Sequence, residues 1–394
     1  MKKLSAIITL VLLGGLILGL TIADFVKQDS VYSSYENRML AKRPTFTLEG
    51  LFLGNYTTDY ETYLTDQFVG RDSWVFVKTC TDVALGKKEV NSVFLAQDGT
   101  LIEKHAPEDY TEEELQEKLV LLKELQEWEE NRGGDGSFHV MLVPTADNIR
   151  TEVLPDNATV FSQTDYMERV KEIIGGDAFI DVTDTLLSHK EEKIYYGSDH
   201  HWTTLGAYYG YKQWAEVLGV EAVPYETETV STNFLGTLHS ITHLPVAEDT
   251  IEVYMPQVLR GDMQSAEDMS ANSHGMQVYY NLSEEAKATL FEPKHLDTKN
   301  QYGYFLDDNQ PFIRIETGTT NEAAQGKTLF ILKDSYANCF VPFLTEHYET
   351  VYVMDLRYFN GKLLPFMEEY DAAGGMDILV LYNVIHFIEE FRYF

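Results

Sequence analysis

Cysteine and positive charge are the scarcest features of this 394-residue chain, which contains 2 Cys and 30 Lys and Arg in total. Two cysteines allow one disulfide at most, so a fold held together by several disulfides is excluded. Against the basic residues stand 63 Asp and Glu, which gives a formal net charge of -33. Such a field repels nucleic acid and anionic lipid headgroups, so we expect no nucleic-acid partner.

A long uncharged apolar run occurs at the start of the chain. Lys2 and Lys3 precede such a stretch over 4–23, which is long enough to cross a membrane as a helix. Residues 1–23 are therefore predicted to be a signal anchor or a signal peptide, and their length favours a retained anchor. We expect a single-pass protein of the cell membrane whose remaining residues lie outside the cytoplasm, or a secreted protein if the segment is cleaved.

The rest of the chain predicts a stalk followed by one α/β domain. Residues 24–50 are polar and irregular and predict the stalk, and residues 51–394 predict the domain. Short apolar strands alternate with helical patterns within it, over 138–144, 178–182, 328–340, 350–356 and 377–383. This alternation indicates a central parallel sheet covered on both faces, which is a three-layer α/β/α arrangement. Residues 220 to about 327 break the alternation with polar strand-like pieces and predict a β-rich insertion.

The candidate catalytic residues lie in two separate stretches. Ser335 follows a buried strand at a predicted strand-to-helix turn, which would present its hydroxyl at the carboxyl edge of the sheet. A serine hydroxyl needs an adjacent base, which is itself oriented by a carboxylate. The stretch GSDHHWTTLGAY (197–208) supplies both. Side chains alternate in an extended segment, so Asp199 and His201 point to the same side and form a better pair than Asp199 and His200.

Two other interpretations of the histidines stay open. The Asp-His-His-Trp block would also suit a metal site completed by other acids, or a hydrogen-bonded structural corner. His239 and His243 have the i, i+4 spacing of zinc ligands on a helix, but the residues between them and Pro245 favour irregular structure. We therefore expect neither a metal nor a cofactor.

Several blocks of the chain resemble a known family. YYGSDHHWTTLGAY, FILKDSYANCFVPFL and DILVLYNVIHF, in this order, are similar to blocks of the DHHW proteins and the alginate O-acetyltransferase-like enzymes, which are related to SGNH hydrolases. The resemblance implies an SGNH-like three-layer domain, with Asp199 as the acid, His201 as the base and Ser335 as the nucleophile. It departs at Lys333, where the wider superfamily usually has Gly, so we expect either a differently shaped turn or a Lys333 that points outward.

The resemblance also implies a function. It predicts serine-dependent O-acetyl transfer to or from a cell-surface or exported polysaccharide, outside the cytoplasm and through an acyl-enzyme. A multi-span membrane acyltransferase is the expected partner that hands over the acetyl group. A carbohydrate acetylesterase with the same triad and a non-catalytic surface protein that binds or assembles glycans stay open as alternatives.

Four further residues are candidates for contacts with the reacting groups. Asn383, at the end of a predicted strand, is either a second oxyanion donor or a strand-end cap. Arg357 would bind a substrate carboxylate or carbonyl, or pair with a nearby acid. Tyr358 and Trp202 would form a platform that stacks on a sugar, or would be core aromatics.

Overall fold

The computed structural model describes most of the chain, namely residues 2–33, 38–256, 275–371 and 375–393. The parts of the predicted stalk over 34–37 and of the predicted insertion over 257–274 lie outside the described residues. The chain divides into two compact units. The first comprises Met1–Lys87 with Ser240–Pro245, and the second comprises Lys88–His239 with Val246–Phe394.

The first unit is helical. It contains α1 (Lys2–Val26), β1 (Tyr32–Ser33), β2 (Arg38–Met39), α2 (Leu48–Leu53), α3 (Asn55–Gln67) and α4 (Arg71–Ala84). Within α1, the 22 residues from Lys3 to Asp24 include an 18-residue window with a mean hydropathy of 2.6, which is enough to span a membrane or to act as a signal. Since α2, α3 and α4 belong to this unit, its boundary lies at Lys87, beyond the predicted start of the domain at residue 51.

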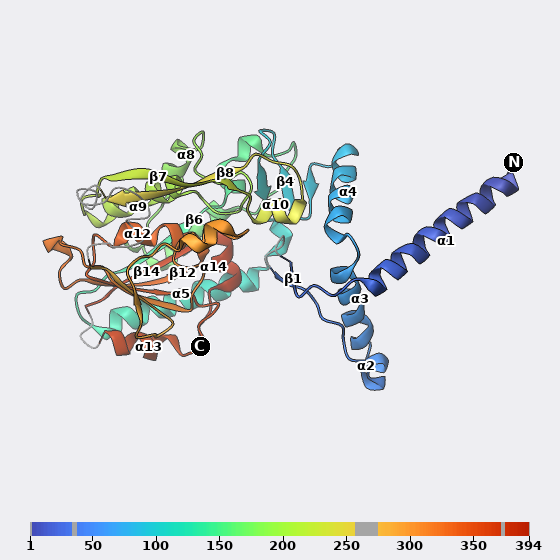
Figure 1. The fold of residues 1–394 in the computed structure, drawn as a ribbon. Helices are drawn as coiled ribbons and strands as arrows, with labels where there is room; N and C mark the ends of the chain where they lie inside the picture. The colour runs from blue at the N-terminus through green and yellow to red at the C-terminus, as the bar shows by residue number, and fades with distance from the viewer. Residues whose placement is uncertain (1, 34–37, 257–274, 372–374, 394) are drawn as a thin grey trace. The chain divides into compact units, whose positions relative to one another are not determined.

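The second unit is built on a seven-stranded sheet (Figure 1). In spatial order its strands are β10 (Ala286–Lys287), β9 (Gln277–Tyr280), β11 (Phe312–Glu316), β13 (Thr350–Met354), β12 (Thr328–Lys333), β14 (Asp377–Asn383) and β6 (Phe138–Val143). The strands from β13 to β6 are parallel, as predicted. The other three come from the predicted insertion and pair antiparallel, so the sheet is mixed rather than wholly parallel.

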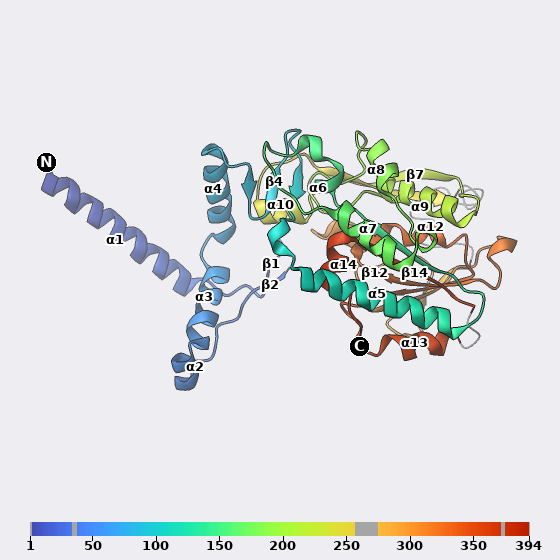
Figure 2. The ribbon, with the colours of Figure 1, turned by 180° about the vertical axis from the view of Figure 1, so that it is seen from behind.

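Helices cover both faces of this sheet, because alternate residues of each strand enter opposite cores. In β12, Leu329 and Ile331 face one core, and Phe330 and Leu332 face the other. The first core is closed by α8 (Thr183–Ser188), α9 (Thr204–Leu218) and α12 (Val341–Leu344). The second core is closed by α5 (Glu112–Arg132), α7 (Gln163–Ile174), α13 (Leu363–Tyr370) and α14 (Val384–Glu390). The result is the predicted three-layer arrangement (Figures 1 and 2).

Smaller elements complete the second unit. They are the sheet of β3 (Glu89–Val90), β4 (Val93–Leu95) and β5 (Leu101–Glu103), the pair β7 (Tyr225–Phe234) and β8 (Asp249–Pro256), α6 (Ala146–Ile149), and α10 (Thr237–Thr242), which continues into the first unit. There are also short 3₁₀ turns at Pro107–Asp109, Thr151–Val153, Gly176–Ala178, Pro293–Asp297, Gln301–Tyr304, Glu322–Ala324 and Ser335–Cys339.

The prediction of a strand over 178–182 is wrong. Phe179 makes a single bridge to Val140, and Asp181 instead accepts a hydrogen bond from the Thr183 backbone at the start of α8. The chain therefore turns into a helix before a strand can extend.

Candidate active site

Ser335 lies at the carboxyl edge of the sheet, where the parallel strands end. β12 stops at Lys333, and Ser335 opens the 3₁₀ turn Ser335–Cys339. The Asp334 side chain caps this turn by accepting a hydrogen bond from the Tyr336 backbone at 2.9 Å. Ser335 is only 5% exposed, so its side chain is buried within the site and not displayed on the protein surface.

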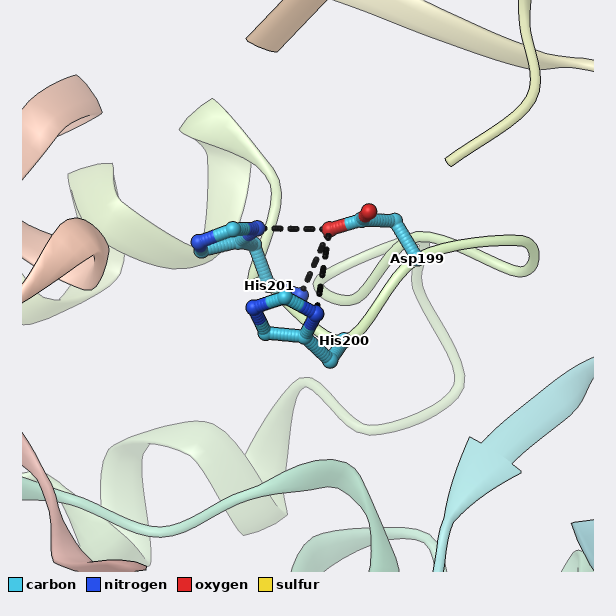
Figure 3. A group of neighbouring side chains, drawn as sticks. All are labelled: Asp199, His200 and His201. Carbon is cyan, nitrogen blue, oxygen red and sulfur yellow. Dashed lines mark hydrogen bonds and ion pairs between the residues drawn. The ribbon is translucent and has the colours of Figure 1, made fainter. Parts of the chain in front are cut away.

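Asp199, His201 and Ser335 form one hydrogen-bonded row. His201 Nε2 lies 2.7 Å from Ser335 Oγ, and His201 Nδ1 lies 2.5 Å from Asp199 Oδ1. Figure 3 shows the Asp199 carboxylate turned toward the His201 ring and backbone. The row thus brings together side chains that are 134 positions apart in the sequence.

The Asp199 carboxylate is buried and fully engaged. Besides the His201 ring, it accepts hydrogen bonds from the backbones of His201 at 3.0 Å and Thr237 at 2.7 Å. Burial by itself raises the pKa of Asp199, but the charges of His200 and His201 and these hydrogen bonds outweigh it, so the pKa lies well below its usual range. Asp199 is therefore ionised, which is the form that fixes the tautomer of a neighbouring imidazole.

Aromatic side chains fix the position of the row. The Tyr302 ring stacks on the His201 ring with centroids 4.0 Å apart, and its hydroxyl donates to the Ser335 carbonyl at 3.0 Å. Trp202 Nε1 donates to the Tyr336 carbonyl at 2.8 Å, and the Tyr336 hydroxyl donates to the His200 carbonyl at 2.6 Å. The two motif stretches are thus joined directly, so the imidazole has little freedom to leave the serine.

Comparison with known proteins places the chain in a family. The sequence profile described as DHHW protein matches residues 132–354, which is more than half of the chain. The chain belongs to the DHHW family. Comparison with curated proteins gives no significant match.

Solved structures share the fold of this DHHW protein. A DHHW family protein from Eubacterium siraeum is 24% identical with a TM-score of 0.58, covering 76% of this chain and 93% of that one. Bacillus cereus PatB1 with a sulfonyl adduct is 17% identical with a TM-score of 0.58, covering 76% and 97%. The O-acetyltransferase domain of Pseudomonas putida AlgJ is more distant, at 14% identity and a TM-score of 0.46, covering 76% and 93%. The expected α/β class with a three-layer domain is confirmed.

Lys333 does not point outward in this DHHW protein, contrary to one of the two expectations. Its side chain is fully buried, and its ammonium group donates to Asn338 at 2.8 Å and Asn309 at 3.0 Å and pairs with Asp355 at 3.2 Å. Burial lowers the pKa of Lys333, an effect that the Asp355 charge opposes. The lysine thus fills the space beneath the turn with a satisfied polar network.

Two of the candidate substrate-binding residues, Asn383 and Arg357, contact other protein side chains. The Asn383 side chain donates to Asp334 at 2.8 Å and accepts a hydrogen bond from the His386 backbone at 2.8 Å, so it caps α14. Arg357 holds Asp355 with both ends of its guanidinium group, at 2.8 and 2.7 Å. These contacts correspond to the cap and the ion pair that the sequence offered as alternatives.

The two candidate stacking residues have different surroundings. Trp202 is 0% exposed and packs parallel to Phe340, so it is a core aromatic and its predicted role as a sugar platform is wrong. A buried ring has no free face on which a sugar could stack. Tyr358 is 47% exposed and keeps an accessible face.

The described residues contain one group of three potential metal ligands whose ligand atoms all lie within 4.8 Å of one another, namely Asp199, His200 and His201. Both His201 ring nitrogens already contact Asp199 or Ser335, so a metal held by this ring would break one of these hydrogen bonds. His239 and His243 do not share a continuous helix, because α10 ends at Thr242 and His243 has a left-handed backbone (φ 58°). The geometry favours the hydrogen-bonded row over either metal site.

Sequence reasoning missed several charged side chains beside the row. Glu103 ends strand β5 and His105 follows it, Asp147 lies in α6, and His386 lies in α14, where its Nδ1 is 2.8 Å from Asp334. No spacing pattern relates these positions, since the fold alone brings them together. The histidine in DILVLYNVIHF was the one available signal.

Proposed function

We propose that this DHHW protein is a serine-dependent O-acetyltransferase that acts on a polysaccharide outside the cytoplasm. The observation that carries the proposal is the row from Ser335 Oγ through the His201 ring to Asp199, with separations of 2.7 and 2.5 Å. Such a row activates a serine hydroxyl at neutral pH, because the imidazole accepts the proton while the carboxylate stabilises the resulting imidazolium.

The proposed reaction has two half-reactions. In the first, Ser335 Oγ attacks the carbonyl carbon of the acetyl donor while its proton moves to His201 Nε2. The tetrahedral intermediate then expels the donor's leaving group, which takes that proton. In the second, a sugar hydroxyl gives its proton to His201 and attacks the acetyl-serine. Collapse of the second intermediate releases the acetylated sugar and returns the proton to Ser335.

A backbone donor is available for the oxyanion that forms in each half-reaction. Ser335 is the first residue of its 3₁₀ turn, and N–H groups at the start of such a turn have no partner within it. We assign the Ser335 N–H to this role, because a donor at the nucleophile itself stays close to the developing charge. Asn383 is a weaker candidate, since its side chain is engaged with Asp334 and α14.

The sulfonyl adduct of Bacillus cereus PatB1 supports covalent chemistry on this fold. A sulfonyl adduct results when a nucleophile displaces a leaving group from a sulfonyl reagent, and an activated serine reacts in this way. The proposal for the present chain therefore predicts that Ser335 reacts with the same class of reagent.

The proposed site of action depends on α1. Its apolar stretch would hold the catalytic unit at the outer face of a membrane. A single span cannot carry an acetyl group across a membrane, so the proposal includes a separate multi-span acyltransferase as the acetyl donor. The acceptor is a cell-surface or exported polysaccharide.

Labelling with a fluorophosphonate probe tests the nucleophile. The wild-type protein is expected to be labelled, and Ser335→Ala is expected to lose the label. Ser137→Ala is the matched control, because Ser137 bonds to Asp377 at the start of β14, at the opposite edge of the sheet. A label that persists in Ser335→Ala would contradict the proposal.

A second measurement separates the proposed transferase from its alternatives. Acetylated product from a glycan acceptor, at a rate above acetate release, identifies a transferase, and acetate release alone identifies an esterase. If Ser335→Ala leaves glycan acetylation in cells unchanged, the protein is a glycan-binding or assembly factor instead.

A further inference from the structure

A second row of charged side chains lies in the same unit as the serine. Asp147 is fully buried and lies 3.0 Å from His105 Nδ1, and the other ring nitrogen of His105 lies 3.7 Å from Glu103. The exposed fraction of the side chain rises along this row, from 0% at Asp147 through 8% at His105 to 39% at Glu103. The row therefore leads from the interior to an accessible carboxylate.

The buried end of this row is held firmly. The Asp147 carboxylate accepts hydrogen bonds from Thr145 Oγ1 at 2.6 Å, Gln163 Nε2 at 3.1 Å and Asn148 Nδ2 at 3.2 Å, besides the His105 ring. Burial lowers the pKa of His105, but the hydrogen bonds and charges of Asp147 and Glu103 raise it to about 10. The imidazole is thus a fixed cation between two carboxylates.

Glu103 is kept ionised by these neighbours. Burial raises its pKa, but the ion pair with His105 and the charges of His200 and His386 lower it to about 2. Burying charged groups costs free energy, and apolar side chains in the same place would avoid that cost. A buried charged network is therefore not explained by fold stability alone. Networks of this kind concentrate at functional sites.

Glu103, the accessible end of the row, lies near His200 and His386, which are neighbours of the catalytic His201. Leu101, in the same strand as Glu103, donates from its backbone to the Gly197 carbonyl at 2.8 Å, so β5 runs beside the stretch that carries His200. Glu103 interacts electrostatically with His200 and His386. The His200 ring lies 4.0 Å from the His201 ring and 6.1 Å from the His386 ring, measured between centroids. The His200 and His386 side chains are 20% and 21% exposed, so both are partly open to solvent, as Glu103 is.

We propose that Glu103, together with His200 and His386, forms the acceptor subsite that binds adjacent hydroxyl groups of a neutral sugar, and that His105 and Asp147 are positioning residues for Glu103. The inference rests on the proposed function and names its substrate class. A carboxylate accepts hydrogen bonds but donates none, and its two oxygens match two neighbouring hydroxyl groups. The Glu103 charge and the formal net charge of -33 of the chain repel the carboxylates of a polyuronate, so the subsite selects uncharged glycans.

The test uses the full-length protein and three neutral oligosaccharides, namely cellohexaose, xylohexaose and N-acetylchitohexaose, with hexagalacturonate as the charged comparison. Binding is measured by calorimetry in the Ser335→Ala background, which separates binding from chemistry. At least one neutral oligosaccharide is expected to bind more tightly than hexagalacturonate. Glu103→Gln, which keeps the shape but removes the charge, is expected to weaken that binding about tenfold, as for the loss of one charged hydrogen-bond acceptor.

Glu89→Gln is the matched control. Glu89 belongs to the same small sheet, is 41% exposed and pairs with Lys104. The substitution therefore removes a carboxylate that is as accessible as that of Glu103 but lies outside the proposed subsite. His105→Gln tests the positioning role. With its fixed cation lost, the pKa of Glu103 rises, so sugar binding in this variant is expected to weaken below about pH 5, near the ordinary range of a glutamate, while wild-type binding does not.

The outcomes are distinguishable from those for the nucleophile. If the protein binds a neutral oligosaccharide in a Glu103-dependent way but Ser335 is not labelled, the proposed function fails and the subsite stands. If Ser335 is labelled but Glu103→Gln and Glu89→Gln bind alike, the subsite is overturned and the proposed function stands. Tighter binding of hexagalacturonate than of every neutral sugar, or binding of none of the four, also overturns the subsite.

Discussion

Replacing Asp199 by asparagine tests the hydrogen-bonded row most directly. Asp199 accepts from the His201 ring and backbone through one oxygen and from the Thr237 backbone through the other. An amide has only one oxygen, so asparagine can accept hydrogen bonds either from His201 or from the Thr237 backbone. Its NH₂ group then faces the donor on the other side. If its NH₂ group faces His201, the ring proton moves to Nε2, which then cannot accept the proton of Ser335.

The expected loss follows from these contacts. A base held in the wrong tautomer costs about 10³- to 10⁴-fold in the rate of serine acylation, which corresponds to about 4 to 5.5 kcal/mol of activation free energy. If the amide instead faces Thr237, two donors meet in a buried site, which costs about 1 to 3 kcal/mol of folding stability.

The assay is the second-order rate constant for fluorophosphonate labelling, with the free energy of unfolding measured in parallel. Asp249→Asn is the matched control, because Asp249 is a neighbouring carboxylate that accepts from Gly197 and Ser198 but does not contact His201. We expect its labelling rate to stay close to that of the wild type. Labelling of Asp199→Asn at a near-wild-type rate would refute the assignment of His201 as the base.

Three further predictions concern the surroundings of the row. Gly236→Ala is expected to slow labelling as strongly as Asp199→Asn, because a Cβ at Gly236 would lie 2.2 Å from Asp199 Oδ2; an unchanged labelling rate would contradict this. Lys333→Met is expected to lower the free energy of unfolding by about 3 kcal/mol in chemical denaturation, because it leaves the buried Asp355 without one of its cations. His105 has a pKa raised from 6.5 to about 10, so its stabilising effect is complete below about pH 6.5 and is lost as the pH rises to about 10. The difference in unfolding free energy between wild type and His105→Gln is therefore expected to shrink over this range, and a constant difference would contradict the ion pair.

The sequence predicted the parallel strands and their helices well, because buried strands and amphipathic helices have distinct periodicities. The helix over 204–218 directly follows the Asp-His-His-Trp block, and Thr203 is its cap. The stretch over 178–182 was misjudged because a short apolar run has no periodicity that separates a strand from a turn packed beside the sheet. The insertion was recognised, but strand pairing between distant segments has no local signal, so its contribution of β9, β10 and β11 to the main sheet was missed.

In the candidate site too, features with a local sequence signal were predicted, and features that depend on packing between distant segments were not. Asp199 and His201 are two positions apart, so alternation along an extended segment was enough to pair them. The position of Ser335 followed from the end of a strand. The role of Trp202 was left open because sequence cannot tell a buried ring from an exposed one, and the structure shows the core aromatic. The contact between His105 and Asp147 depends on how α6 packs, which no local pattern encodes.

The Tyr302 ring, which covers the imidazole, comes from the segment that interrupts the α/β alternation. That segment therefore forms part of the candidate site and cannot be exchanged freely. A chimera that grafts the corresponding segment of a relative must supply an aromatic residue at the same place, or the general base loses its support.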